Sequence, residues 1–419
     1  MFNVNKQFFL AILSQFLIFQ LKGDLLAQNQ ISIVKEIQSA LSKHGFENVA
    51  VLQDNTDIII TYENRIYRYE ARAIAEVLRC VADLHTPNAR CILIPQKRGI
   101  PIAAIKADLQ SRRFTADDKS VPFGMLGEMD AALTVEPYWT KLKNRKRMNS
   151  STAKLDITVH PQFRAQFGNY VNTVESQVNL APVASTTLWK GMSLSAQWIF
   201  PLQNELGYEG DFARPGLLTL NQTVRLPYNA FLSGTAGYFT QHRYGADLDV
   251  KKFWWNGRWA AGVNMGYTGF AAYLKGVWYW SDVDTWTGVL YGEYRFPKLD
   301  FTIKATYGKF IYRDKGFRFD VFRQFGEVAV GFFTIKTTRG RNGGFSFSVP
   351  IFPSKRLRPA RIRISPASQF PWSYWYSGLN DYGIQYATGN SVDEFIRDYH
   401  PDFLRNQFNE HSFDTRGGI

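Results

Sequence analysis

The clearest pattern along this chain is an alternation of apolar and polar residues in its C-terminal half. Residues 299–307 read Leu-Asp-Phe-Thr-Ile-Lys-Ala-Thr-Tyr, and residues 344–351 repeat the same period of two. Because the side chains of a strand point alternately to its two faces, this period predicts strands with one apolar and one polar face. Two more such segments, around 317–321 and 328–336, lie between them, so the stretch is predicted to be an antiparallel meander.

The same period begins much earlier, at Leu155. The segment 155–167 is longer than a typical soluble strand and matches the roughly 9–11 residues that cross a bilayer at a tilt. With a closing strand near 374–386, the predicted total is about 12–14 strands, whose ends are uncertain by several residues. Further strands are predicted at 173–181, 186–200, 216–227, 230–240, 246–254, 258–267, 271–281 and 284–296.

The aromatic residues decide between lipid and a packed core as the partner of the apolar faces. They make up 16% of the chain and cluster near segment ends, as at 253–255 and 278–280. Interfacial belts of membrane proteins have this placement, and a sheet that spans lipid must close because its edges find no other partner there. Residues 153–390 are therefore predicted to form a transmembrane antiparallel β-barrel. The alternative is a periplasmic β-sandwich or propeller.

A different pattern occupies residues 31–107. Apolar residues at helical spacing alternate there with short β-rich segments in the order αββαββ. This order predicts a small α+β domain, of the kind that serves as a periplasmic adaptor. The fold class is thus mainly β, a barrel preceded by a small α+β periplasmic domain.

The remaining segments are predicted from composition. Residues 1–27, with Lys6 before a short apolar run, fit a signal peptide, and the alternative is a buried N-terminal helix. Residues 108–152 are predicted to be a polar linker, and 391–419 a polar C-terminal tail. The basic run 141–147 within the linker either contacts lipid phosphates or is simply solvated.

Charge and cysteine content leave two questions open. The net charge of +13 could attract an acidic polymer or anionic lipid, or could reflect scattered loop charges. Cys80 and Cys91 are the only cysteines. In an oxidising compartment they could form a disulfide, and otherwise they are small buried hydrophobic residues.

No motif of a known catalytic centre is present in the sequence. There is no GxSxG, HExxH or phosphate-loop pattern, and the six histidines lack metal-ligand spacing. Carboxylates such as Glu293, Asp320 and Glu327 could serve a glycoside hydrolase, which needs two at a defined separation. In a barrel such groups more often pair with basic residues of the lumen. We therefore expect no enzyme activity, no cofactor and no metal.

If polar alternates point into a barrel, some basic residues become candidates for lining its lumen. A basic lining would favour anionic groups, as charged rings do in pores. The alternative is that these residues pair with nearby carboxylates and fill the interior. The candidates are Lys304, Arg318, Arg323 and Lys336.

Several segments resemble the YjbH/GfcD-type exopolysaccharide proteins. They lie at 47–49, 60–68 and 99–101, and again within 307–326 and 330–351. The resemblance implies an outer-membrane β-barrel with periplasmic adaptor domains, linked to the synthesis or secretion of exopolysaccharide or capsule. It also implies that a periplasmic protein and an outer-membrane lipoprotein act alongside. This chain is shorter than the better-known members, as a single-barrel version would be.

These observations lead to one functional hypothesis and two alternatives. The chain is predicted to be an outer-membrane barrel protein that passes or anchors an acidic or neutral exopolysaccharide, together with periplasmic and lipoprotein components. One alternative is a non-conducting anchor or assembly protein with a plugged lumen, and the other is a surface glycan hydrolase. Outer-membrane lipid is an expected partner, and nucleic acid is not.

Overall fold

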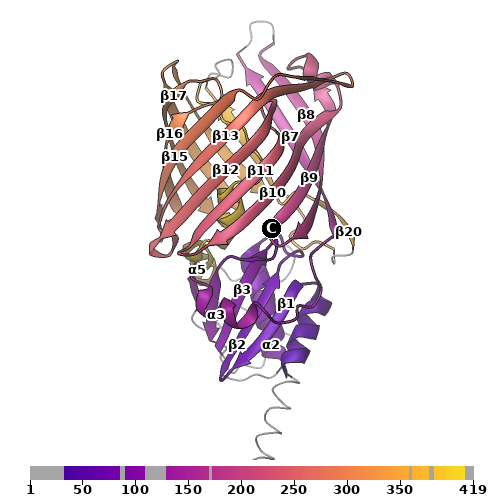
Figure 1. Ribbon diagram of the computed structural model, residues 1–419, viewed down its shortest axis with the longest axis vertical. Helices are drawn as coiled ribbons and strands as arrows, with labels where there is room; N and C mark the ends of the chain where they lie inside the picture. Colours follow the sequence, from indigo (N-terminus) through magenta and orange to yellow (C-terminus); the bar gives the residue numbers. More distant parts are fainter. Residues whose placement is uncertain are drawn as a thin grey trace, which may run out of the picture.

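The computed structural model describes residues 33–84, 90–108, 129–168, 172–357, 361–376 and 382–410. The predicted signal peptide lies outside the described residues. Two sheets make up the molecule, a small one below and a large one above in Figure 1. The mainly β architecture that the sequence predicts is confirmed. Within the described residues, no helix has the length and apolar character needed to cross a membrane.

The small sheet follows the predicted order of elements and extends it. Its strands run in the order β1-β2-β3-β5-β6, with β4 paired to β3. The strand pair β2–β3 is parallel, so the chain crosses between them through helix α2. The elements are β1 (Glu47–Asp54), β2 (Asp57–Glu63), α2 (Glu70–Asp83), β3 (Arg90–Lys97), β4 (Ile100–Pro101), β5 (Ala104–Asp108), β6 (Met129–Ala132) and α3 (Glu136–Leu142).

Part of the predicted linker belongs to this unit. β6 pairs with β5, and α3 places Leu142 and Val135 in a core on one face of the small sheet. The linker prediction for 108–152 is therefore wrong at these elements, because the polar residues around them hid two short segments whose apolar side is buried. Residues 109–128 lie outside the described part of the chain.

The opposite face of the small sheet is covered by three helices from the two ends of the chain. A helix of residues 33–44 and α2 lie there beside α5 (Pro401–Glu410). Phe403 and Leu404 of α5 are at most 1% exposed and belong to the same apolar core as Ile74 of α2. The predicted polar tail at 391–419 is thus corrected, since a helix at this end completes the N-terminal core.

The large sheet begins with β7 and contains fifteen strands within the described residues. Each strand pairs antiparallel with the next along the path, apart from β20, which pairs parallel with β7. Its strands are β7 (Leu155–Phe167), β8 (Val174–Trp189), β9 (Met192–Asn204), β10 (Arg214–Leu226), β11 (Ala230–Phe239), β12 (Arg243–Trp254), β13 (Trp259–Leu274), β14 (Val277–Trp280), β15 (Thr285–Phe296), β16 (Phe301–Lys309), β17 (Lys315–Phe325), β18 (Val328–Thr337), β19 (Arg341–Pro350), β20 (Ile362–Pro366) and β21 (Gln369–Trp375).

This sheet carries its apolar residues on the outside. In β16, Ile303 and Tyr307 are 38% and 47% exposed, whereas Thr302 and Thr306 are 4% exposed. The alternation therefore has the opposite sense to that of a soluble sheet, whose apolar face packs on a core. The same arrangement exposes large apolar side chains on many other strands, among them Phe163, Phe200, Leu220, Met265, Leu290, Phe319, Phe332 and Ile364.

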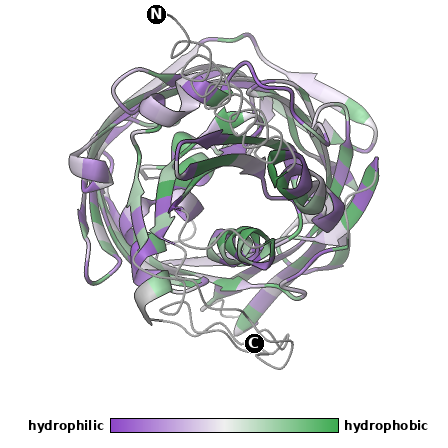
Figure 2. Cartoon of the chain, turned by 90° about the horizontal axis from the view of Figure 1, so that it is seen from below, coloured by the Kyte–Doolittle hydropathy of each residue, from purple (hydrophilic) through white to green (hydrophobic). Residues whose placement is uncertain are grey.

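The large sheet curls round on itself, and its two ends meet at one continuous segment (Figures 1 and 2). β20 pairs with β7, whereas β21, two residues further on, pairs with β19. The rings of Phe163 on β7 and Trp372 on β21 lie 6.5 Å apart, and those of Phe167 and Tyr374 lie 6.1 Å apart. The edges of the path are therefore side by side.

Two turns and the closing strand differ in position from the prediction. A single long strand, β8, replaces the predicted break between 181 and 186, and the turn comes instead at residues 190–191, where Gly191 has φ +79°. The predicted strand 271–281 contains a hairpin turn at 275–276. Alternation continues through both turns, so the period alone could not locate them. The predicted closing strand ends at Trp375.

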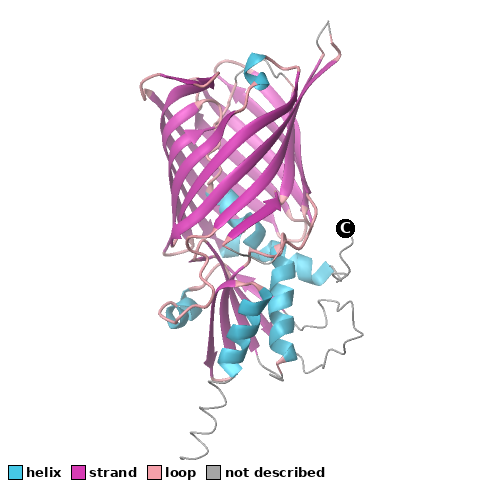
Figure 3. Ribbon diagram, turned by 90° about the vertical axis from the view of Figure 1, so that its right-hand side faces the viewer, coloured by secondary structure: helices cyan, strands magenta, loops and turns pink. Residues whose placement is uncertain are grey.

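The two sheets meet at an apolar cluster. Ile100 and Leu133 come from the small unit, Phe231 and Phe253 from the large sheet, and Phe395 from α4 (Val392–Ile396). Figure 3 shows helices gathered where the large sheet meets the small one, while strands form the rest of the wall. The C-terminal residues thus form part of the junction between the two sheets.

Candidate functional site

The structure brings two of the four predicted basic residues to the inner face of the large sheet. Lys304 on β16 forms ion pairs with Glu293, 3.1 Å away, and with Asp393, 2.5 Å away. Arg318 on β17 forms an ion pair with Asp320 at 2.7 Å and lies over the ring of Phe333. Both residues therefore pair with carboxylates, which agrees with the alternative that the basic residues pair with nearby carboxylates and fill the interior.

The other two basic residues do not face inward. Arg323 follows Arg318 by five positions, so in an unbroken strand it must point to the opposite face. It shares that outer face with exposed Phe319 and Phe325. Lys336 on β18 likewise shares the face of exposed Phe332. Both predicted placements are wrong, because the prediction relied on the polar character of these residues. Their odd or even position in the alternation of the strand, which we call strand parity, places them on the outer face.

The carboxylates weighed for hydrolysis are all engaged. Asp320 pairs with Arg318, and Glu293 pairs with Lys251 and Lys304. Glu327 accepts two hydrogen bonds from Arg68 of the small unit. Among the described residues, no group of three or more His, Cys, Asp or Glu side chains is placed to hold a metal ion.

The two cysteines are free and buried. Cys80 lies on α2 and Cys91 on β3, and both belong to the apolar core of the small unit. Burial raises the pKa of Cys80 to about 11 and that of Cys91 to about 12. The possible disulfide is not formed in this structure. The two cysteines are instead small buried hydrophobic residues, as the alternative predicted.

A segment that sequence reasoning missed runs along the inside of the large sheet. We call residues 382–400 the C-terminal strap. It begins near the loops at one end, where the backbone N–H of Gly383 donates to Asp314 at 2.9 Å. It continues past Asp247, which accepts from Tyr386 at 2.8 Å, and reaches the opposite end at His400, whose ring contacts the carbonyl of Gly257 at 2.9 Å.

The strap is held near its middle by polar groups of β10 and β11. The carbonyl of Asn390 accepts from Ser233 at 2.7 Å, and its side chain donates to Thr219 at 3.2 Å. Arg98 of the small unit donates to the same side chain at 3.1 Å. One asparagine thus joins the strap, the wall of the large sheet and the small unit.

An ion cluster fixes the strap below that point. Asp393 lies between Lys251 and Lys304, and both lysines also contact Glu293. The wall side of the cluster is buried, with Lys251 only 4% exposed, whereas Asp393 of the strap is 39% exposed. Burial alone would raise the pKa of Asp393, but the two ammonium groups hold that pKa well below its usual value. The strap therefore supplies the carboxylate that neutralises the inner wall.

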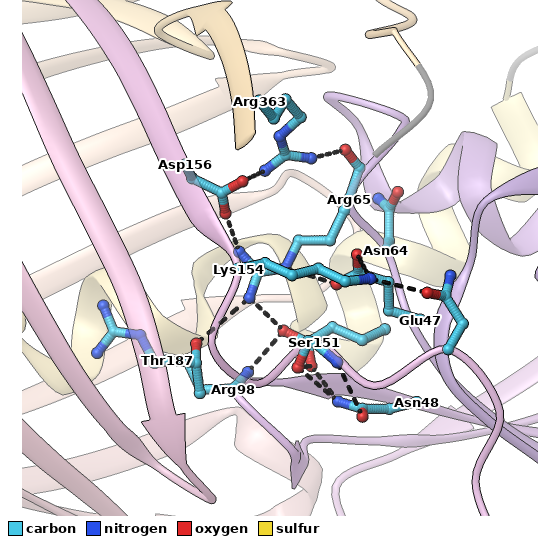
Figure 4. Close-up of polar contacts among 12 residues, drawn as sticks. Glu47, Asn48, Asn64, Arg65, Arg98, Ser151, Lys154, Asp156, Thr187 and Arg363 are labelled. Carbon is cyan, nitrogen blue, oxygen red and sulfur yellow. Dashed lines mark hydrogen bonds and ion pairs between the residues drawn. The ribbon is translucent and has the colours of Figure 1, made fainter. Parts of the chain in front are cut away.

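A second ionic network joins the small unit to the first strand of the large sheet (Figure 4). Arg65 pairs with Glu63 at 3.0 Å, with Asp156 of β7 at 2.5 Å and with Glu47 at 3.7 Å. Arg363 of β20 pairs with Asp156 on its other side, at 2.9 Å. The guanidinium group of Arg65 thus links the carboxylates of the small unit to Asp156 of β7, and that of Arg363 links Asp156 to β20.

Glu63 is the best satisfied member of this network. Its carboxylate accepts hydrogen bonds from Asn48 at 2.7 Å, from Ser151 at 3.0 Å and from the backbone N–H of Arg98 at 2.9 Å. It is 2% exposed. Because a buried carboxylate without partners is very costly, these contacts specify one relative position of strand β2, the 98–99 turn and residue 151.

A buried acid of the small unit titrates near neutrality. Glu70 is 3% exposed and accepts hydrogen bonds from Tyr62 and Asn64, each at 3.0 Å. Burial raises its pKa to about 7, against the lowering effect of these two bonds. Burial of the adjacent Tyr399 raises the pKa of that phenol well above its usual value, so Tyr399 stays neutral. The strap thus ends beside an acid that changes charge in the physiological range.

Comparison with known proteins identifies one family. Residues 22–216 match the model of the YjbH family, described as exopolysaccharide biosynthesis protein YbjH. This match confirms the resemblance suggested by the sequence, and it covers the small unit and the first strands of the large sheet. The resembling segments between 307 and 351 lie outside the matched residues. A comparison with curated proteins found no match.

The Arg65 network gives a first prediction. Replacing Arg65 with Met removes the cation shared by Glu47, Glu63 and Asp156, and we expect a loss of about 3 kcal/mol in unfolding free energy, at the lower end for breaking a buried pair because Lys154 and Arg363 remain. Protonation relieves the repulsion between neighbouring carboxylates, so the variant should recover part of its stability when the pH is lowered. Guanidinium unfolding in detergent measures both effects.

The control for this variant is Arg90→Met, which breaks the Arg90–Asp57 pair on the surface, where Arg90 is 54% exposed. A much smaller loss than in Arg65→Met is expected there, because water screens an exposed ion pair. Equal losses in the two variants would contradict the assigned role of Arg65.

Glu70 gives a second prediction. Its folded pKa of about 7 lies above the reference value of 4.5. The folded chain therefore binds more protons than the unfolded chain between these values, and stability should fall as pH rises from about 4.5 through 7, by about 3 kcal/mol at most. Glu70→Gln should remove this part of the pH dependence. Identical pH profiles for the variant and the parent chain would refute the assignment.

Proposed function

We propose, from the match of residues 22–216 to the YjbH family, that this chain acts in exopolysaccharide biosynthesis or export as an outer-membrane β-barrel. The small unit would stand in the periplasm and dock the periplasmic and lipoprotein components of the system, or the polymer itself. The large sheet would be the membrane-spanning part. The exposed apolar outer face of this sheet is the single observation that carries the proposal.

Solvent exposure of that face would be unfavourable. Leu290, Phe332 and Ile364 are each at least 60% exposed, and they lie on three different strands. Burial of apolar surface is worth roughly 25 cal/mol per Å², so a whole face of such residues calls for a non-aqueous partner. Monomeric soluble proteins rarely expose apolar patches beyond a few hundred Å². The hydrocarbon of a lipid bilayer is a partner that could cover the apolar outer face on all of these strands.

Strand length agrees with a bilayer. β7, β9 and β10 each have 13 residues. At about 3.3 Å per residue and a tilt of about 45°, such a strand spans about 30 Å along the membrane normal, which is the thickness of the hydrocarbon core. The strands of a tilted barrel would thus cross the core once each.

The free edges of the sheet must also be satisfied, because lipid offers no hydrogen bonds. The segment 362–375 supports closure, since its first part pairs with β7 and its second part pairs with β19. We propose that this segment closes the barrel. The parallel pairing of β20 with β7 is the expected geometry when the closing strand and the first strand run in the same direction.

Large aromatic residues lie at both ends of the strands, as interfacial belts require. Trp189 and Trp254 end β8 and β12 near the small unit, and both are exposed. Trp280 and Trp286 lie at the opposite end, near the loops. These side chains would mark the two membrane surfaces.

The strap gives specific support to the alternative role, a non-conducting anchor with a plugged lumen. Residues 382–400 occupy one side of the interior and bind β10–β12 and β16 through buried ions and amides. The polymer would then pass only if the strap moved. Since each of the three candidate carboxylates is paired, we propose a role without glycan hydrolysis, which an absence of released reducing ends would support.

A third prediction tests the main role. Deleting the gene should lower cell-bound or secreted exopolysaccharide, and the intact protein should appear in outer-membrane fractions with heat-modifiable migration on gels, as folded barrels show. A water-soluble mature chain, found outside the membrane fraction, would exclude the barrel. An unchanged glycan profile together with membrane localisation would exclude the export role alone.

A fourth prediction separates passage from anchoring. Asp393→Ala leaves only Glu293 to balance the charges of Lys251 and Lys304 and removes the strap's own ion pairs with the wall, which should loosen the strap. We expect the parent chain to be silent or nearly silent in planar bilayers and this variant to show frequent openings.

The control is Asp398→Ala, since the Asp398 side chain is 40% exposed and contacts only its neighbour Arg397, at 3.8 Å, among the ion pairs of the described residues. It should behave as the parent chain does. Open channels of equal frequency in all three proteins would show that the strap does not gate the lumen.

A further inference from the structure

Two cations converge on one tryptophan beside the junction of the two sheets. The Arg147 guanidinium lies 5.1 Å from the centre of the Trp139 ring, and the Lys190 ammonium lies 5.4 Å from it. Trp139 belongs to α3 of the small unit, whereas Lys190 sits in the turn between β8 and β9 of the large sheet. The ring is therefore shared by both parts of the molecule.

Lys190 is held in place by its turn. The backbone N–H of Gly191 donates to the carbonyl of Arg98 at 2.8 Å, and the carbonyl of Lys190 accepts from Gln222 at 3.2 Å. The side-chain stem of Lys190 passes 3.6 Å from the position that a Cβ at Gly99 would occupy. The ammonium group is thus directed toward Trp139 by packed neighbours.

Neither of these two cations forms a close ion pair within the described part of the chain, although the charge of Glu63 acts on Arg147 at longer range. No ion pair of either Arg147 or Lys190 with a described carboxylate is found, whereas Lys141 of the same basic run pairs with Asp54. Burial lowers the pKa of Lys190, and the charge of Arg147 lowers it further. The ring offers partial compensation through cation–π contacts. Two unneutralised cations at one ring favour an anion between or beside them.

The location identifies the kind of anion. Trp189, next to Lys190, is 55% exposed and ends a strand of the outer face, where its indole N–H donates to Gln222 at 3.0 Å. An exposed indole at a strand end marks the membrane–water boundary in the proposed barrel. Lys190 and Arg147 would then lie at the depth of lipid headgroups on the periplasmic side.

We propose that Trp139, Arg147 and Lys190 form a binding site for the phosphate of an anionic phospholipid, which fastens the small unit to the inner surface of the membrane. This inference rests on the proposed membrane role. The site bridges two parts of the molecule that are otherwise joined by the Arg65 network and the apolar cluster. Lipid binding would add a contact that exists only when both parts are correctly placed.

The test uses the full chain purified in a nonionic detergent. Native mass spectrometry measures the retention of dioleoylphosphatidylglycerol and of dioleoylphosphatidylcholine, which have the same acyl chains and differ in net charge. We expect the parent chain to prefer the anionic lipid by about thirtyfold, which corresponds to about 1 kcal/mol for each of the two basic residues near an anionic surface. Arg147→Gln combined with Lys190→Gln should abolish this preference.

A matched control variant also removes two positive charges, in this case both from the basic run 141–147. Lys143 and Arg145 are exposed, and no ring or ion partner is found for them among the described residues. Lys143→Gln combined with Arg145→Gln should keep the preference, because neither side chain has a cation–π contact with the Trp139 ring among the described residues. Trp139→Leu keeps both charges and should lower the preference several-fold. Heat-modifiable migration checks that every variant is folded.

Three results would overturn the proposal. The first is equal retention of the two lipids by the parent chain, and the second is an equal loss in the matched variant. The third is binding of an acidic oligosaccharide, oligogalacturonate, that depends on Arg147 and Lys190, together with lipid retention that does not depend on them. That result would make the site a glycan site. Outer-membrane fractionation of the parent chain distinguishes these outcomes from failure of the barrel role.

Discussion

A sheet with apolar side chains outside and polar side chains inside is stable only if both faces find suitable partners. The inner face of this protein finds its partner within the same chain. Lys251 and Lys304 would be costly in the interior without a counter-charge, and Asp393 of the strap provides it together with Glu293. The apolar outer face has no comparable partner within the described residues. That imbalance is the physical basis for the proposal that the sheet lies in a membrane.

The strap connects this requirement with the small unit. Asn390 contacts Ser233 of the wall and Arg98 of the small unit, and Tyr399 lies beside Glu70. Movement of the strap along the interior would therefore disturb contacts at the junction. The interior charges, the junction and the core of the small unit are mechanically linked through one segment. The contacts of the small unit therefore bear on the state of the interior.

Strand parity explains what the sequence could and could not predict. The alternation at 299–307 correctly separates outward Ile303 from inward Lys304. The same rule, applied with equal strictness, would have excluded Arg323, which is an odd number of positions from Arg318. It could not assign β18, where Phe332 and Phe333 are consecutive and both faces are apolar. The strap was missed because residues 382–400 are held by long-range polar contacts and have no period of their own.

The placement of α5 has a consequence for how the protein is made. Phe403 and Phe408, close to the end of the chain, are part of the same core as Ile37 and Leu41 near its beginning. The first-made unit therefore lacks several of its packing partners until the last helix has arrived. A polypeptide cut short during synthesis would keep a hydrophobic gap at its N-terminal end, even if every earlier residue were in place. The core of the small unit is therefore complete only when α5 has joined it.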